Sequence, residues 1–256
     1  MSKFAEKLQR IYKGSAPALG FRKSVEAEIP PLLFVASLVK TGATEAYSLA
    51  MAGIDAGILS TKGLSAKSFA ELTKAVGGGV SLGCSLDAAE KDAAAKSIGV
   101  GCDFVIFGLK TSLEAVNKDG LGRVLKIEPT LEPGLVRAIS TLPIEIDGVL
   151  VAGDETTITI ERLLIYQRVT ELLNKPLLVT VSPTITVEEL KSLVKAGVNG
   201  IVLPETFSAE TLANLKQSTA GLSRGARRRT KAAAILPRVS GELETEVEEE
   251  EEDEDI

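Results

Sequence analysis

Short apolar runs alternate with amphipathic stretches along most of this 256-residue chain. Eight runs rich in Val, Ile and Leu lie between turn residues, and they are too continuous for strands with one face in water, which is typical of buried parallel strands. Most of the stretches between them have helical patterns, and residues 112–117 predict only a short helix. The predicted strands are 32–38, 56–60, 79–84, 104–109, 124–128, 148–152, 177–181 and 200–203, and the longer predicted helices are 43–52, 65–75, 87–97, 133–140, 158–173, 186–196 and 208–218.

Four of the predicted strands follow a recurring phrase: a turn with a small residue, an apolar residue, then Asp or Asn. The acidic or amide residues are Asp55, Asp103, Asp147 and Asn199, at spacings of 48, 44 and 52 residues, about the length of two strand-plus-helix units. This repeat predicts an α/β fold, a (β/α)8 TIM barrel spanning residues 30–222. Because these polar residues precede strands, we expect them to close turns on their own backbone at the stabilising end of the barrel.

Residues 1–29 predict an N-terminal helical extension. Phe4, Leu8, Ile11 and Tyr12 recur at helical spacing, with Lys and Arg residues around the other face. Such a helix either covers the bottom of the barrel, which is the interpretation we favour, or lies on an anionic membrane surface.

Acidic and basic residues are distributed unevenly along the chain. Residues 241–256 hold eleven acidic residues and no basic one, which predicts a disordered acidic tail. The rest of the chain holds 29 basic against 24 acidic residues, and residues 223–240 form an Arg-rich basic linker. A contact between this linker and nucleic acid is the less favoured alternative, since no aromatic residues are interleaved with the basic ones.

Composition narrows the available chemistry. The chain has no histidine, so the commonest general base and transition-metal ligand are absent. Its two cysteines, Cys84 and Cys102, are predicted at opposite ends of the barrel, where no disulfide would form, which fits a reducing compartment. No apolar stretch approaches the ~20 residues that span a bilayer, and the start lacks a signal-peptide core. We therefore expect a cytoplasmic protein, and the oligomeric state is not indicated.

With the strands assigned, residues 30–221 resemble the aldolase-type TIM-barrel superfamily. Residues 196–203, Ala-Gly-Val-Asn-Gly-Ile-Val-Leu, and residues 100–107, Val-Gly-Cys-Asp-Phe-Val-Ile-Phe, are similar to the joints between helix and strand in those barrels. The likeness is to the small phosphate-binding members, such as thiamine-phosphate synthase-like and ribulose-phosphate-binding proteins. It concerns the fold and names no activity.

The resemblance implies a phosphate held on glycine-rich turns after the seventh and eighth strands. The corresponding turns here, residues 181–186 and 203–208, depart from that pattern. Each contains a proline, which has no amide to donate, and neither contains a Gly-Gly pair. Glu205 in the second turn would repel a phosphate.

Polar side chains at the predicted strand exits are the candidates for chemistry, because the active sites of such barrels lie there. Lys126 and Glu128 share one face of the fifth strand, about 7 Å apart along it. If that face is the inner one, Lys126 is a candidate Schiff-base nucleophile and Glu128 its proton shuttle. Otherwise the two form a structural ion pair, or Lys126 points outward beneath a helix. The candidate substrate-binding residues are Ser37, Ser60, Ser85, Asp154, Ser182 and Glu205.

The sequence identifies no cofactor, although two remain conceivable. Asp154 and Glu155, joined by Glu128 and Glu205, would suit Mg²⁺, which accepts oxygen ligands; alternatively, residues 154–157 simply begin a helix. A flavin is the second, since isoalloxazine rings often rest on barrel mouths. Cys84 is either a nucleophile or, as we favour in a chain without histidine, a small packing residue.

By analogy of fold, and with Lys126 and Glu128 in the lead roles, we favour an enzyme of the lyase, aldolase or isomerase type that acts on a small anionic or carbonyl-containing metabolite at the barrel mouth. The alternative is a non-catalytic barrel that serves as a binding or scaffold module through its charged termini. The first hypothesis depends on the orientation of Lys126, and the second on the tails.

Overall fold

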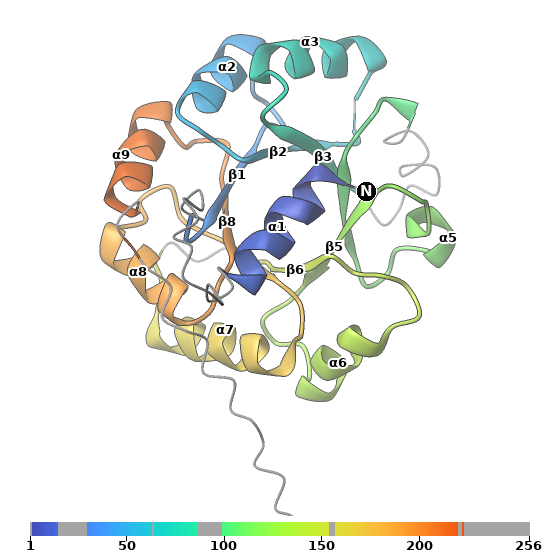
Figure 1. The fold of residues 1–256 in the computed structure, drawn as a ribbon, viewed down its shortest axis with the longest axis vertical. Coiled ribbons are helices and arrows are strands. Elements are labelled where there is room, and N and C mark those ends of the chain that lie inside the picture. Colours follow the sequence, from blue (N-terminus) through green and yellow to red (C-terminus); the bar gives the residue numbers. More distant parts are fainter. Residues whose placement is uncertain are drawn as a thin grey trace, which may run out of the picture. The chain divides into compact units, whose positions relative to one another are not determined.

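The computed structural model describes residues 2–14, 30–62, 64–86, 99–153, 157–219 and 222. Eight strands, each parallel to its neighbours, close into a barrel in the order β1 to β8, with helices around it (Figure 1). The predicted TIM barrel is therefore confirmed. The elements are α1 Lys3–Lys13, β1 Leu33–Ser37, α2 Ala43–Met51, β2 Ala56–Ser60, α3 Ala66–Val76, β3 Ser81–Ser85, β4 Phe104–Gly108, α5 Leu113–Val116, β5 Gly122–Ile127, α6 Pro133–Ala138, the 3₁₀ turn η1 Ile139–Thr141, β6 Gly148–Val151, α7 Ile160–Leu172, β7 Leu177–Thr180, α8 Val187–Lys195, β8 Gly200–Leu203 and α9 Ala209–Thr219.

The strand boundaries lie close to those predicted. β2 and β8 match the prediction, whereas β5 begins earlier, at Gly122. The predicted helix at residues 87–97 lies outside the described residues, as do the predicted basic linker and acidic tail.

The barrel has two apolar cores, one on each side of its wall. Successive residues of a strand point to opposite faces, so one set fills the barrel and the other packs beneath the helices. On β5, Val124 belongs to the inner core, whereas Leu125 and Ile127 belong to the outer one. This alternation fixes the face on which each later residue of the strand lies.

The inner core is built in layers. Because the strands tilt, inward residues of alternate strands reach the same height, and each layer holds four positions. Two consecutive layers are entirely apolar or glycine, and the ring of Phe104 fills the space beside Gly83, where a Cβ would lie 2.5 Å from it. The registers place Val35, Gly83, Val124 and Leu178 in the lower of these layers and Ile58, Ile106, Leu150 and Val202 in the upper.

Helix α1 closes the amino-terminal end of the barrel. Phe4, Leu8 and Ile11 are buried in the inner core, and the Phe4 ring stacks on Phe104 with 4.1 Å between centroids. Figure 1 shows α1 lying across the strands of the barrel. The favoured interpretation is confirmed, and the membrane alternative is wrong because the barrel itself buries this apolar face. Among the described helices, none has the length and apolar character needed to cross a bilayer.

Two strand glycines make room for this helix. A Cβ on Gly122 would lie 2.6 Å from Ser2 Oγ, and one on Gly148 would lie 2.7 Å from a Leu8 methyl group. Lys7 Nζ also donates to the carbonyl of Gly79 at 2.7 Å. The floor of the barrel is therefore shaped to receive α1.

The recurring polar residues lie at strand entrances, as predicted, but they do not close turns on their own backbone. Three of them accept a hydrogen bond from a main-chain amide of the preceding strand, because a parallel strand pair offers that amide directly beside the entrance. The bonds run from Phe34 N to Asp55 at 2.9 Å, from Arg123 N to Asp147 at 2.8 Å and from Leu177 N to Asn199 at 2.9 Å.

Asp103 is the exception among the four. Its carboxylate accepts from Ser2 Oγ at 3.0 Å, Lys3 N at 2.9 Å and Phe4 N at 2.8 Å. These amides lack partners within α1, since the first turn of a helix leaves its N–H groups free. Asp103 therefore anchors the helix, whereas the other three entrance residues join neighbouring strands.

A capping box begins α8. Thr186 Oγ1 accepts from Glu189 N, and the Glu189 carboxylate accepts from Thr186 N at 2.8 Å. Glu189 also accepts from Ile158 N at 3.1 Å, so it joins α8 to the loop before α7. Burial acts to raise the pKa of Glu189, but the hydrogen bonds from Thr186 and Ile158 outweigh it and lower that pKa.

Candidate functional site

The next layer of the barrel interior, at the carboxyl ends of the strands, is polar. It comes from the odd-numbered strands and lies directly above the layer that contains Ile106. Three of its members are hydroxyl residues and one is a lysine, and all are at least partly exposed to solvent. The layer consists of Ser37, Ser85, Lys126 and Thr180.

Lys126 therefore lies on the inner face of the barrel. It follows Val124 of the inner core by two residues, and its side chain is exposed through the open mouth. Its register partner on β4 is Gly108, and on β6 the next inward residue above its partner Leu150 is Ala152. The ammonium group is thus flanked on both neighbouring strands by positions with little or no side chain.

Lys126 and Glu128 are on the same side of the β5 segment but do not form an ion pair. Both side chains are exposed, and within the described residues no hydrogen bond or salt bridge joins Lys126 to a neighbour. The alternative of an outward lysine beneath a helix is wrong, because alternation along β5 places it inward.

The other candidate binding residues are dispersed around the rim. Ser60 Oγ accepts from Lys62 N at 3.2 Å, and Ser182 Oγ lies 2.8 Å from Thr184 Oγ1 within the turn after β7. Glu205 pairs with Lys40 at 3.7 Å on the exposed edge between β8 and β1. Ser37 and Ser85 lie with Lys126, whereas Asp154 is outside the described residues.

Thr180 belongs to the polar layer although it was not among the predicted site residues. Its hydroxyl donates to Gly153 O at 2.8 Å and accepts from Gly153 N at 2.7 Å, which holds the end of β6 against β7. Alternation puts Thr180 on the same face of β7 as Leu178, but only the structure shows that this face is the inner one.

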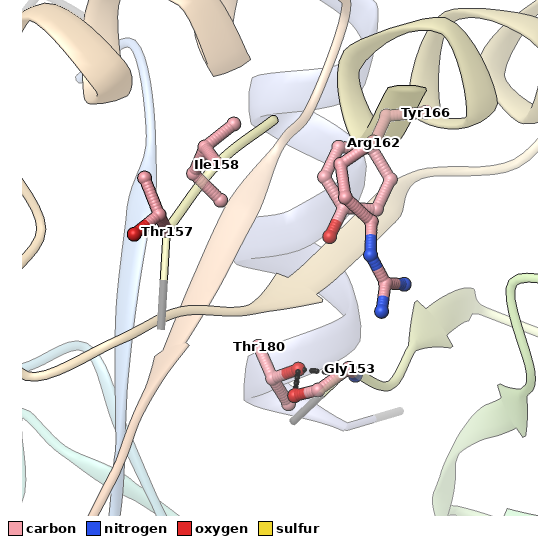
Figure 2. Close-up of a pocket in the computed structure, with 6 residues that line it drawn as sticks. All are labelled: Gly153, Thr157, Ile158, Arg162, Tyr166 and Thr180. Carbon is pink, nitrogen blue, oxygen red and sulfur yellow. Dashed lines mark hydrogen bonds between the residues drawn. The ribbon is translucent and has the colours of Figure 1, made fainter. Parts of the chain in front are cut away.

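A small hollow opens beside Thr180, between the exits of β6 and β7 and the first turn of α7. It is shallow and open to solvent, and it is lined by Gly153, Thr157, Ile158, Arg162, Tyr166 and Thr180. Figure 2 shows the Arg162 guanidinium directed from α7 toward Gly153 and Thr180. A Cβ on Gly153 would lie 3.1 Å from that guanidinium, so the glycine gives the arginine its room.

The start of α7 differs from one sequence interpretation. Thr159 is the N-cap, its Oγ1 accepting from Arg162 N at 3.2 Å, whereas residues 154–156 of the interpreted helix start lie outside the described residues. Within the described part of the chain, no three Asp, Glu, Cys or His side chains gather as a metal site. Asp154 and Glu155 lie outside the described residues, so the suggested Mg²⁺ ligands are not tested.

Cys84 and Cys102 lie together rather than at opposite ends of the barrel. The register pairs Gly83 with Phe104, so β4 begins level with the middle of β3 and its entrance comes close to the β3 exit. Neither cysteine forms a disulfide, and both are buried in the outer core. A hydrogen bond between the two thiols, and then burial, raise the pKa of Cys102. Cys84 faces away from the mouth, so the nucleophile hypothesis is wrong.

Comparison with known proteins finds likeness in structure alone. No family model matches the chain, and no curated protein matches it. Orotidine 5′-phosphate decarboxylase from Pyrococcus horikoshii OT3 is similar over 74% of this chain and 100% of its own, with a TM-score of 0.59 and 18% identity. This likeness agrees with the TIM-barrel fold of the chain.

Two further solved barrels agree with this fold. A mutant tryptophan synthase α-subunit from Pyrococcus furiosus is similar over 75% of this chain and 99% of its own, with a TM-score of 0.56 and 15% identity. The thiamine phosphate pyrophosphorylase of the same organism is similar over 73% of this chain and 95% of its own, with a TM-score of 0.54 and 15% identity. Identities this low bear on the fold of this TIM barrel and not on its activity.

Proposed function

We propose that this TIM barrel is an enzyme of the lyase, aldolase or isomerase type that binds a small carbonyl-containing, anionic metabolite at its mouth. The observation that carries the proposal is the position of Lys126, the one amine in an otherwise hydroxyl-bearing layer at the carboxyl ends of the strands. Active sites of TIM barrels lie at this end. The solved structures of the same fold include a decarboxylase and a pyrophosphorylase, which supports an enzyme-type barrel.

Lys126 is the proposed nucleophile. Its neutral amine would add to the substrate carbonyl carbon, and loss of water would leave an iminium group that can accept electrons from a neighbouring carbon. Glu128, the next residue on the same side of the segment, would accept and return the protons. Ser37 and Ser85, which share the layer with Lys126, would hold the substrate's oxygen atoms.

Two cations on the mouth side support an anionic substrate. The Lys126 ammonium is exposed in the mouth, and the Arg162 guanidinium is directed toward the exits of β6 and β7 (Figure 2). Positive groups that line a concave site raise the local concentration of anions.

Reduction of the iminium tests the proposal. Borohydride delivers hydride to the iminium carbon and leaves a stable secondary amine, which peptide-resolved mass spectrometry locates. With a panel of aldehydes, 2-oxo acids and hydroxyketones, we expect at least one compound to label Lys126 saturably and in preference to the exposed Lys195. Lys126→Met should abolish this labelling, and Glu128→Gln should slow turnover by about a hundredfold, the usual scale for a general acid or base. Equal labelling of Lys126 and Lys195 by every compound would reject the Schiff-base role.

A further inference from the structure

The glycines of the strands separate into two kinds. At five of the six strand glycines in the described residues, an added Cβ would meet a neighbouring atom at 3.3 Å or less, so packing favours glycine there. Only Gly108, the last residue of β4, has no described atom within 4 Å of that position. The nearest distances for the other five are 2.4 Å at Gly57, 2.5 Å at Gly83, 2.6 Å at Gly122, 2.7 Å at Gly148 and 3.3 Å at Gly200.

Backbone conformation does not explain Gly108 either. It is not among the glycines with positive φ, so any L-residue could adopt its conformation. Glycine at an inner strand position is destabilising unless something needs the space. Neither of the usual structural reasons for a strand glycine therefore applies.

The open space at Gly108 lies beside Lys126. Phe104 and Ile106 belong to the inner core, so Gly108 faces inward by alternation, and the β4–β5 register pairs it with Lys126. A side chain at position 108 would project over the amine from β4. On the other flank Ala152 presents only a methyl group.

We propose that Gly108 is a specificity-determining position: its missing side chain keeps open the volume beside the Lys126 amine that the reacting part of the substrate occupies. That a substrate occupies this volume rests on the proposed function. The steric relation between positions 108 and 126 does not depend on it. The ligand class is a compact carbonyl compound whose carbonyl carbon reaches Lys126 past β4. A larger residue at position 108 would exclude the bulkier members of that class.

Reductive alkylation with simple aldehydes measures this access without requiring the natural substrate. The amine adds to the aldehyde, water leaves, and added cyanoborohydride supplies hydride to the iminium carbon. Glyoxylate serves as the small probe and benzaldehyde as the large one. The readout is labelling of Lys126 relative to Lys195, which is exposed at the far end of α8.

Gly108→Leu should lower benzaldehyde labelling of Lys126 by about tenfold, the scale of one misplaced methylene group or more in a fitted site, with a smaller effect on glyoxylate. Gly134→Leu is the matched control, since Gly134 is exposed on α6 with its nearest neighbour 3.9 Å from an added Cβ; it should leave the labelling ratio unchanged. Gly108→Val replaces the leucine variant if that variant does not fold, as judged by circular dichroism.

The result that overturns the proposal is wild-type benzaldehyde labelling of Lys126 in the folded Gly108 variant. Failure of benzaldehyde to label Lys126 in the wild-type protein would also overturn it, because the volume would then not be open. If the Gly108 variant lowers benzaldehyde labelling of Lys126 as expected but no metabolite is trapped saturably, the steric role of Gly108 is supported and the Schiff-base function is rejected.

Discussion

The carboxylate of Asp103, at the entrance to β4, accepts a hydrogen bond from the Phe4 amide at 2.8 Å, and the adjacent Phe104 ring stacks on the Phe4 ring. Two consecutive residues therefore hold the first turn of α1, one through its free amides and one through its apolar face. The helix that fills the bottom of the barrel is oriented by this joint, and the polar layer at the top is left as the open end.

Loss of the Asp103 carboxylate should loosen α1. Asp103→Ala removes a charged acceptor from three donors, two of which are helix N-terminal amides, and we expect a loss of about 2–3 kcal/mol in the free energy of unfolding. Chemical denaturation measures that loss, and hydrogen exchange should show faster exchange of the α1 amides than in the wild-type protein.

Asp119→Ala is the control for this prediction, since Asp119 is exposed in the turn before β5. It should change the free energy of unfolding by less than about 0.5 kcal/mol. Unchanged exchange of α1 in Asp103→Ala would show that apolar packing alone holds the helix.

Asp147 should cost stability at neutral pH. Burial raises the pKa of Asp147, against the opposing hydrogen bond from Arg123 N. A raised native pKa means that the native state binds more protons than the unfolded state, so stability falls as pH rises from the ordinary value of 3.8 through the native one. The destabilisation by the ionised Asp147 carboxylate is therefore absent below that pH range and complete above it.

Asp147→Asn removes this dependence while keeping an oxygen acceptor, as Asn199 does at the equivalent position of β8. We expect the variant to be more stable than the wild type at pH 7, and to show no gain near pH 3. Thermal unfolding of both proteins across this range measures the difference. A variant that is less stable than the wild type at pH 7 would contradict the burial argument.

Glu189 should behave in the opposite way. Its lowered pKa means that the charged form is favoured in the native state, so its contribution is present above the ordinary value of 4.5 and is lost as pH falls through the native value. Glu189→Ala should therefore lose about 1 kcal/mol at pH 7 and little at low pH. Glu188→Ala, one residue away and exposed, is the comparison, and an equal loss in both variants would argue against the bond to Ile158.

Hydrophobic pattern was sufficient to predict the barrel. Continuous apolar runs such as residues 56–60 and 200–203 became strands with the predicted limits, because a strand buried on both faces leaves a signal that no neighbour obscures. The Asp and Asn residues at the entrances were placed correctly for the same reason. Their partners were not, because hydrogen bonds to the preceding strand depend on register.

The candidate site was predictable only in part. Alternation in β5 was enough to put Lys126 and Glu128 on one side, but the height of each side chain within the barrel comes from strand tilt, which no single segment encodes. Thr180 and Gly108 were missed for this reason, and so was the contact between Cys84 and Cys102. Each of these relationships depends on the register between neighbouring strands.

The Schiff-base role of Lys126 can be tested by a crystal structure of the borohydride-reduced adduct. We expect continuous density from Lys126 Nζ to the trapped compound, lying over Gly108 and within reach of Ser37 and Ser85. Density on another lysine, or a Lys126 side chain directed away from the barrel axis with no adduct, would contradict it.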